Sequence, residues 1–210
     1  ALSRDEKIGF PDEYRQGRYG DIFGDIRGKL PALDMPGAVV LDIGCGCAEL
    51  PQMLMGHCQA QGNELILVDS EEMLGCLPDR AGVKKLPCCF PDCPDLLKDY
   101  AGRVDAILVY SVIQYVFAEG NIHKFVDRAL SLLAPGGQLL LGDIPNVSKR
   151  RRFFSSERGI AHHKAFMNTD EAPAVEYGCI DEDTMDDAVV FALLMRSRDA
   201  GFDAYVMPQH

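Results

Sequence analysis

The most constraining feature of the sequence is a short apolar run that ends in a glycine-rich turn. Residues 39–43, VVLDI, have the composition of a buried strand, and GCGCA follows at residues 44–48. Gly44 and Gly46 let the chain turn sharply and let a ligand approach the backbone, because glycine carries no Cβ. A strand, a glycine turn and a helix in this order predict a βα unit whose helix N-terminus offers free N–H groups.

Further apolar runs repeat the pattern along the chain. We expect strands within residues 64–68, 83–90, 104–110, 138–142 and 202–207. Helical periodicity is clearest at residues 122–133, after an expected N-cap at Asn121, and at 188–195, which Asp183 or Thr184 is expected to cap. Continuous apolar strands between helices predict an α/β fold with a doubly wound, mostly parallel sheet that helices flank.

Composition narrows the class of protein further. The chain has 210 residues, which suits one domain, and a formal net charge of −11, which disfavours general nucleic-acid binding. It has neither an apolar run long enough to span a bilayer nor an N-terminal secretion signal, so we expect a cytoplasmic protein without membrane attachment.

Eight cysteines are present, and none of their spacings is the paired C-x-x-C of a zinc site. We therefore expect no metal, and we expect reduced cysteines in structural positions.

An acidic residue at the end of the second strand indicates a nucleoside ligand. Asp69 lies 21 residues after Ala48, the usual placement of a carboxylate that accepts hydrogen bonds from ribose hydroxyls. The alternative is that the glycines only make a tight turn and Asp69 caps the next helix. Glu49 occupies the third small position of the dinucleotide fingerprint, which disfavours NAD.

The small residues instead form D-x-G-x-G-x-A, from Asp42 to Ala48. This run resembles the first motif of the class I S-adenosylmethionine-dependent methyltransferases. Residues 68–74, 104–116 and 132–137 are similar to later motifs of that family in the same order. The resemblance covers roughly residues 37–144. The chain departs from the family where Ala48 replaces a glycine and where the seventh strand is apparently missing or trimmed.

The resemblance implies S-adenosylmethionine as cofactor and S-adenosylhomocysteine as product. The glycine loop would lie against the methionine moiety, Asp42 would orient the loop or the amino group, and Asp69 would hold the ribose. Adenine would lie near Ser70 and the region of Cys89 and Phe90. The full expected cofactor set is Asp42, Gly44, Cys45, Gly46, Asp69, Ser70, Cys89, Phe90, Tyr110 and Ser111.

The acceptor side is expected to use residues beyond the fifth strand. Candidate general bases are His162, His163 and Asp143, although exposed or structural histidines are the alternative for the pair. Four consecutive cations, Lys149, Arg150, Arg151 and Arg152, suit a phosphate or carboxylate on the acceptor, or simply a solvated helix.

We expect one domain with four parts: an N-terminal helical cover (1–36), a cofactor-binding core (37–145), an acceptor-side lid (146–183) and a C-terminal helix and strand (184–210).

The leading hypothesis is methyl transfer to an oxygen or nitrogen of a small or medium polar acceptor, with anionic and sugar-like molecules as options. The alternatives are an RNA or protein methyltransferase and a non-catalytic S-adenosylmethionine-binding protein, with an NAD-dependent oxidoreductase further behind. The sequence leaves the oligomeric state open.

Overall fold

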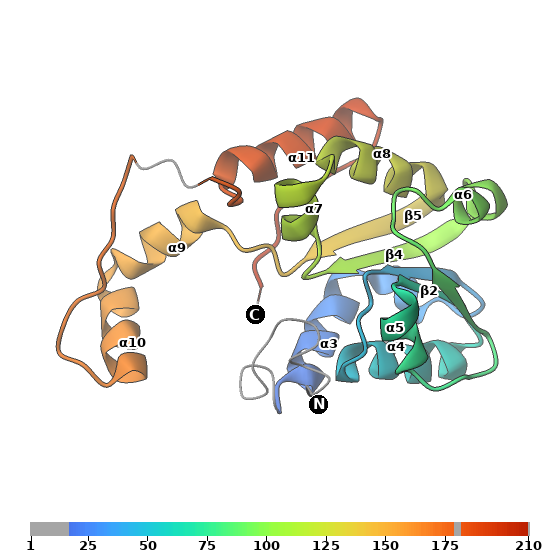
Figure 1. Cartoon of the computed structure of the whole chain (residues 1–210), viewed down its shortest axis with the longest axis horizontal. Helices are drawn as coiled ribbons and strands as arrows, with labels where there is room; N and C mark the ends of the chain where they lie inside the picture. The colour runs from blue at the N-terminus through green and yellow to red at the C-terminus, as the bar shows by residue number, and fades with distance from the viewer. Residues whose placement is uncertain (1–16, 179–181, 210) are drawn as a thin grey trace.

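Three layers make up the molecule in the computed structural model, which describes residues 17–178 and 182–209. A sheet lies in the middle, with α3, α4 and α5 on one side and α6, α7, α8 and α11 on the other (Figure 1). Its strands are β1 (Val39–Ile43), β2 (Glu64–Asp69), β3 (Val83–Pro87), β4 (Val104–Tyr110) and β5 (Leu133–Gly142).

All the strand pairs are parallel, in the order β3-β2-β1-β4-β5. The doubly wound α/β prediction is therefore confirmed. The order reverses direction between β1 and β4, and ligands of open parallel sheets bind at the carboxyl ends of the strands at such a reversal.

The helices divide between the two faces because successive strand residues point to opposite sides. The helical bounds are α3 (Tyr19–Lys29), α4 (Glu49–Gln61), α5 (Glu71–Gly75), α6 (Pro94–Tyr100), α7 (Ile113–Glu119), α8 (Ile122–Leu132), α9 (Val147–Phe154), α10 (Glu157–Met167) and α11 (Asp187–Asp199), with a 3-10 turn η1 at Pro31–Asp34. Leu65 and Leu67 of β2 pack with α3 and α4, whereas Ile66 and Val68 pack on the face that α6 and α8 cover. Fully burying each such side chain contributes about 1.5–3 kcal/mol to folding.

Residues 1–16 of the expected helical cover (1–36) lie outside the described residues, so the structure describes only its later part, which contains α3. Tyr19, Phe23 and Ile26 of α3 are buried in the core cluster that includes α4. This helix therefore packs on the body of the protein.

Helix caps agree with the sequence at α8 and differ at α11. The Asn121 side chain accepts a hydrogen bond from the Lys124 amide, as expected for the cap of α8. The prediction of Asp183 or Thr184 for α11 is wrong, because Asp186 accepts from the Val189 amide and begins the helix. Asp183, Thr184 and Asp186 are all residue types that cap helices, so the sequence alone does not tell at which of them the helix begins.

The expected strand at 202–207 is also wrong, because this segment joins no ladder. Tyr205, Val206 and Met207 are exposed, and the segment leads back to Gln209, whose side chain donates to the Tyr110 hydroxyl over 3.1 Å. The apolar alternation reflected half-burial of Phe202 and Ala204 rather than strand pairing. Within the described residues, β5 is thus an edge strand. Residues 135–137, which come before the strand expected at 138–142, lie inside β5, and the pairing of β5 with β4 shifts register there.

A projecting arm follows β5. It consists of α9, α10 and the segment that follows α10 up to residue 178, and Figure 1 shows it extending away from the layers. Its base is fixed to α11: Asn146 and Arg152 both contact Asp187, and the Val147 amide donates to the Met185 carbonyl over 2.9 Å.

One expectation about the cysteines is wrong. Cys88 and Cys93 form a disulfide that closes the loop after β3. The free thiols among the described residues are Cys45, Cys47, Cys58, Cys76 and Cys89. Cys179 lies outside the described residues. A pairing five residues apart requires a loop that folds back on itself, and no sequence spacing signals that path.

None of the described helices combines the length and the apolar character that a membrane crossing requires.

Candidate functional site

The glycine loop lies at the reversal point of the sheet, as the sequence predicts for a ligand-binding turn. Gly44 has φ 73° and Gly46 has φ 65°, a backbone region that other residues rarely adopt. The Gly44 amide continues the ladder by donating to the Val68 carbonyl over 2.8 Å. A Cβ on Gly44 would lie 2.5 Å from Cγ2 of Val112, so the segment after β4 packs directly on this loop.

Asp69 ties the end of β2 to the same loop. One carboxylate oxygen accepts from the Gly46 amide over 2.7 Å, and the other accepts from the Ser70 amide over 2.7 Å. Each oxygen can accept a second hydrogen bond, so the carboxylate keeps capacity for further donors. The capping alternative falls to Ser70, whose hydroxyl accepts from the Met73 amide and begins α5.

A buried carboxyl group lies beneath the loop. Asp42 of β1 is 3% exposed, and burial together with the negative charge of Asp69 raises its pKa to about 8. The same burial and the same two acids raise the pKa of the Cys45 thiol. Because Asp42 is neutral below about pH 8, the Asp69 carboxylate supplies the negative potential of the loop, at which a cation is favoured.

The loop after β3 forms the neighbouring wall of the site. The Cys88 amide donates to the Asp69 carbonyl over 3.2 Å, which places the disulfide-closed loop beside that residue. Cys89 is exposed, whereas Phe90 is buried with its ring 4.8 Å from that of Phe125 on α8. Phe90 thus packs into the protein body.

Across the reversal point, β4 and β5 end in a strained pair. Ser111 and Asp143 have φ values of 60° and 53°, in the left-handed region that costs non-glycine residues about 1–3 kcal/mol each. The Ser111 hydroxyl donates to Asp143 Oδ2 over 2.5 Å, and the Ser111 amide donates to the Gly142 carbonyl over 3.0 Å. Strained residues of this kind concentrate at functional sites.

Tyr110, one of the predicted residues, completes this cluster together with Gln209, which the sequence does not single out. The Gln209 amide donates to the Tyr110 hydroxyl and lies 3.4 Å from Asp143 Oδ1. A Cβ on Gly142 would lie 2.5 Å from the Tyr110 ring, so only glycine allows the ring to lie across β5.

Gln114, at the start of α7, was also missed. Its Nε2 donates to the Ser111 carbonyl over 2.8 Å, and its Oε1 is the one buried side-chain polar atom among the described residues without a hydrogen-bond partner. A single glutamine in an apolar helix start carries no sequence signal.

The remaining predicted residues do not meet at this edge. His162 stacks on Phe166 at 6.1 Å between ring centroids, and His163 lies against Phe154, both within the arm. Of the four cations, Arg152 pairs with Asp187 and Arg150 lies over the Phe154 ring. The arm projects from the layers (Figure 1). The structure therefore brings Asp143 to the carboxyl edge of the sheet and leaves the histidine pair outside it.

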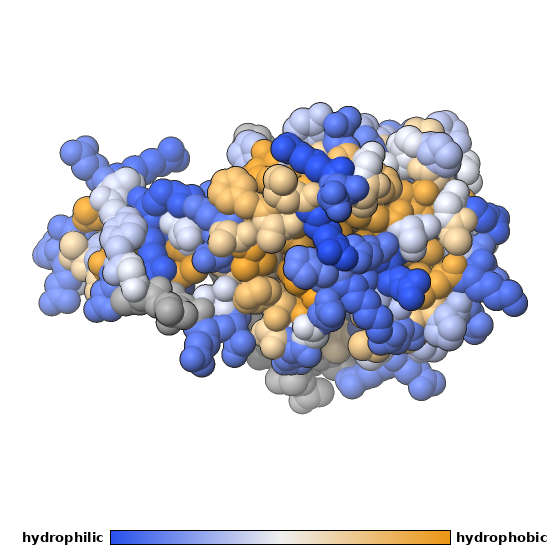
Figure 2. Space-filling model, turned by 90° about the horizontal axis from the view of Figure 1, so that it is seen from above, coloured by the Kyte–Doolittle hydropathy of each residue, from blue (hydrophilic) through white to orange (hydrophobic). Residues whose placement is uncertain are grey.

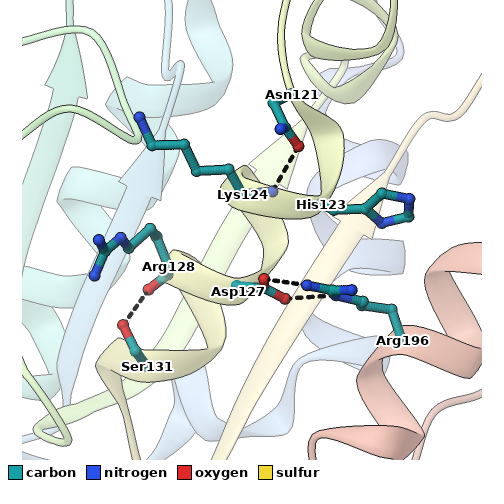
Figure 3. Close-up of a pocket in the computed structure, with 7 residues that line it drawn as sticks. All are labelled: Asn121, His123, Lys124, Asp127, Arg128, Ser131 and Arg196. Atoms are coloured by element: carbon teal, nitrogen blue, oxygen red, sulfur yellow. Dashed lines mark hydrogen bonds and ion pairs between the residues drawn. The ribbon is translucent and has the colours of Figure 1, made fainter.

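A hollow with a volume of about 340 Å³ lies along α8, and Arg196 of α11 also lines it. Figure 3 shows Arg196 of α11 forked against Asp127 of α8, with N–O distances of 2.8 and 2.5 Å. This ion pair holds the two helices together. Over residues 17–178 and 182–209, no cluster of three or more His, Cys, Asp or Glu side chains is arranged to hold a metal.

Comparisons with known proteins agree with this geometry. The chain aligns over 89% of its length with a carbon methyltransferase, CurJ, at a TM-score of 0.55 and 16% identity, covering 49% of that chain. It aligns over 90% with the plantazolicin methyltransferase BpumL in complex with a pentazolic desmethylPZN analogue and SAH, at a TM-score of 0.54 and 14% identity, covering 67% of that chain.

A short segment also matches a curated sequence. It is 39% identical over 56 residues to the chondramide synthase cmdD of Chondromyces crocatus, which is 27% of this chain and 1% of that protein. No family model matches the sequence.

The sheet order, the glycine loop and the acid at the end of β2 define a class of fold. The chain has the class I methyltransferase fold, as the motif resemblance implied.

Proposed function

We propose that this protein is an enzyme that binds S-adenosylmethionine and transfers its methyl group to a polar acceptor. The observation that carries the proposal is the convergence of the glycine loop, Asp69 and buried Asp42 at the reversal point of the sheet. S-Adenosylmethionine offers what these groups favour, namely two ribose hydroxyls and two positive charges. NAD brings a negatively charged pyrophosphate to the loop, where the Asp69 carboxylate repels it.

The chain's own residues fit this cofactor in distinct ways. Gly44 and Gly46 leave the backbone open for the methionine portion, and Asp69 has lone pairs left for the ribose. Asp42, neutral in the folded protein below pH 8, becomes ionised more readily beside a cation. The exposed surface of Ser70 and Cys89 lies on the adenine side in this assignment.

The cofactor supplies an electrophilic methyl group, so the protein mainly has to align a nucleophile and take up its proton. We assign the uptake of the proton to Asp143. Its carboxylate lies at the carboxyl end of β5, and the donated hydrogen bond from Ser111 fixes its orientation. With S-adenosylmethionine bound, the Asp143 carboxylate would take up the proton of the acceptor's nucleophilic group.

The acceptor class remains a further step of the proposal. A small or medium molecule with an oxygen or nitrogen nucleophile suits a single carboxylate base, and the 146–183 segment lies next in the chain after Asp143. The cations Lys149 and Arg150 favour an acceptor with an anionic group. The CurJ and BpumL comparisons leave protein- or peptide-borne acceptors as the second candidate.

The test is the affinity of an Asp69→Ala variant for S-adenosylmethionine. Loss of the charge-assisted hydrogen bonds should weaken binding by about 1–3 kcal/mol, measured by calorimetry. Asp99→Ala, an exposed acid on α6, is the matched control and should bind as wild type does. Unchanged affinity in a folded Asp69→Ala protein would contradict the ribose assignment.

A further inference from the structure

The start of α7 carries a polar atom that the described residues leave without a hydrogen-bond partner. Gln114 Oε1 is buried and has no donor among the described residues. Its orientation is fixed, because the Nε2 atom of the same amide donates to the Ser111 carbonyl over 2.8 Å. Buried acceptors are nearly always paired in native proteins, so an oriented and unpaired one at a ligand-binding edge indicates a donor on the ligand.

The sheet order tells which end of the ligand reaches Gln114. Asp69 ends β2, and Gln114 follows β4, on the opposite side of β1. Val112, two residues before Gln114, packs on Gly44 at the end of β1. A ligand whose ribose lies at Asp69 and whose middle crosses the glycine loop therefore presents its other end to the start of α7.

The amino-acid end of S-adenosylmethionine carries one donor group and one acceptor group. An amide oxygen accepts hydrogen bonds and repels a carboxylate, so the α-carboxylate is excluded as its partner. The α-ammonium group is the donor that remains at this end.

Resting on the proposed function, we propose that Gln114 binds the cofactor's α-ammonium group by accepting a hydrogen bond at Oε1. Ser111 is then a positioning residue, because its carbonyl orients the Gln114 amide. The assignment adds a cofactor contact from α7 to those from the ends of β1 and β2.

The experiment compares two ligands that differ in the whole amino-acid end, and the Gln114→Glu variant then separates the α-ammonium group from the α-carboxylate, because a carboxylate at this position attracts the first and repels the second. S-Adenosylhomocysteine carries the amino-acid end, whereas 5′-methylthioadenosine retains the adenosine and the thioether and lacks it. Their affinities are measured by calorimetry for the full wild-type chain and for Gln114→Leu, Gln114→Glu and Gln59→Leu. Gln59 is exposed on α4 and supplies the same chemical change away from the edge.

We expect Gln114→Leu to weaken S-adenosylhomocysteine binding about tenfold or more and to change methylthioadenosine binding by less than about twofold. Gln114→Glu keeps the acceptor and should bind S-adenosylhomocysteine at least as tightly as wild type. Gln59→Leu should change neither affinity. The melting temperature of ligand-free Gln114→Leu should stay the same or rise, because an unsatisfied acceptor is removed.

An equal loss of both ligands in Gln114→Leu would overturn the assignment in favour of a structural or adenosine-side role. Unchanged binding of both would overturn it outright. These results differ from a failure of the proposed function, in which the wild-type chain would bind neither ligand.

Discussion

The carboxyl edge of the sheet and the projecting arm place their polar residues in different ways. At the edge, Asp42, Asp69 and Asp143 are far apart in sequence and lie at the same end of the sheet because the strands run parallel. On the arm, four cations are consecutive in sequence and spread around a helix, where Arg152 turns to Asp187 and Arg150 to Phe154. The fold therefore gathers residues from separate strand ends into one site, whereas the role of a charged run on an exposed helix depends on what each side chain contacts.

The surfaces of the two regions differ as well. In α9 and α10, residues 147–167, six Lys and Arg side chains stand against Glu157 alone, although the whole chain has a net charge of −11. In Figure 2 the arm is mainly hydrophilic, whereas apolar surface lies over the middle of the molecule. Phe191 and Met195 of α11 are among the exposed apolar side chains. The edge is thus negative and partly buried, and the helices of the arm are positive and solvated.

The largest expected effect concerns the buried acid of the edge. In the folded protein Asp42 is protonated up to about pH 8, whereas in the unfolded chain it ionises near its ordinary value of 3.8. Asp42 therefore lowers stability progressively as pH rises from about 4 to 8. Asp42→Asn should remove this slope and gain a few kcal/mol over wild type at pH 8, with little difference below pH 4.

Urea unfolding at several pH values measures this effect, with Asp105→Asn as the control. Asp105 lies near the start of β4, where it accepts from the Val39 amide. Parallel stability profiles for wild type and Asp42→Asn would show that the pKa of Asp42 is not raised in the folded protein and would contradict the neutral state assigned to it below pH 8.

A smaller effect is expected at the wall beside Asp69. The Cys88–Cys93 disulfide closes a short loop, so its removal in Cys88→Ser/Cys93→Ser should cost about 2 kcal/mol of stability by loop entropy. Binding of S-adenosylhomocysteine should weaken as well, because the Cys88 amide contacts the Asp69 carbonyl. Cys89→Ser, one residue away, is the control and should leave stability unchanged. Equal stability of the double variant and wild type in oxidising buffer would refute the structural role of the disulfide.

The smallest effect on cofactor binding is expected from the arm. Replacing Arg150, Arg151 and Arg152 with Ala should change S-adenosylhomocysteine affinity by less than about twofold, because the arm is distant from the edge and its charges are screened. The same variant should impair use of an anionic acceptor once one is identified. A large loss of S-adenosylhomocysteine affinity in the calorimeter would show that the arm contributes to the cofactor site and would break the contrast between the regions.

How much the sequence predicts follows the same division. The continuous apolar strands and their terminal residues, such as Gly44 and Asp69, were predictable because each buried strand reads as an uninterrupted run with a glycine or an acid at its end. The contact between Ser111 and Asp143 was not, because left-handed backbone at a serine and an aspartate has no sequence signature. Residues 202–207 show a further limit of prediction from sequence. Apolar alternation indicates which side chains are half-buried, but it does not show whether the segment pairs with another strand.

The most direct test of the central claim is a calorimetric titration of the wild-type chain with S-adenosylhomocysteine, with NAD as the control ligand. The account predicts saturable, one-to-one binding of S-adenosylhomocysteine and no heat of binding from NAD, because the Asp69 carboxylate at the glycine loop favours the α-ammonium group of S-adenosylhomocysteine over the pyrophosphate of NAD. Binding of NAD without binding of S-adenosylhomocysteine would contradict the account.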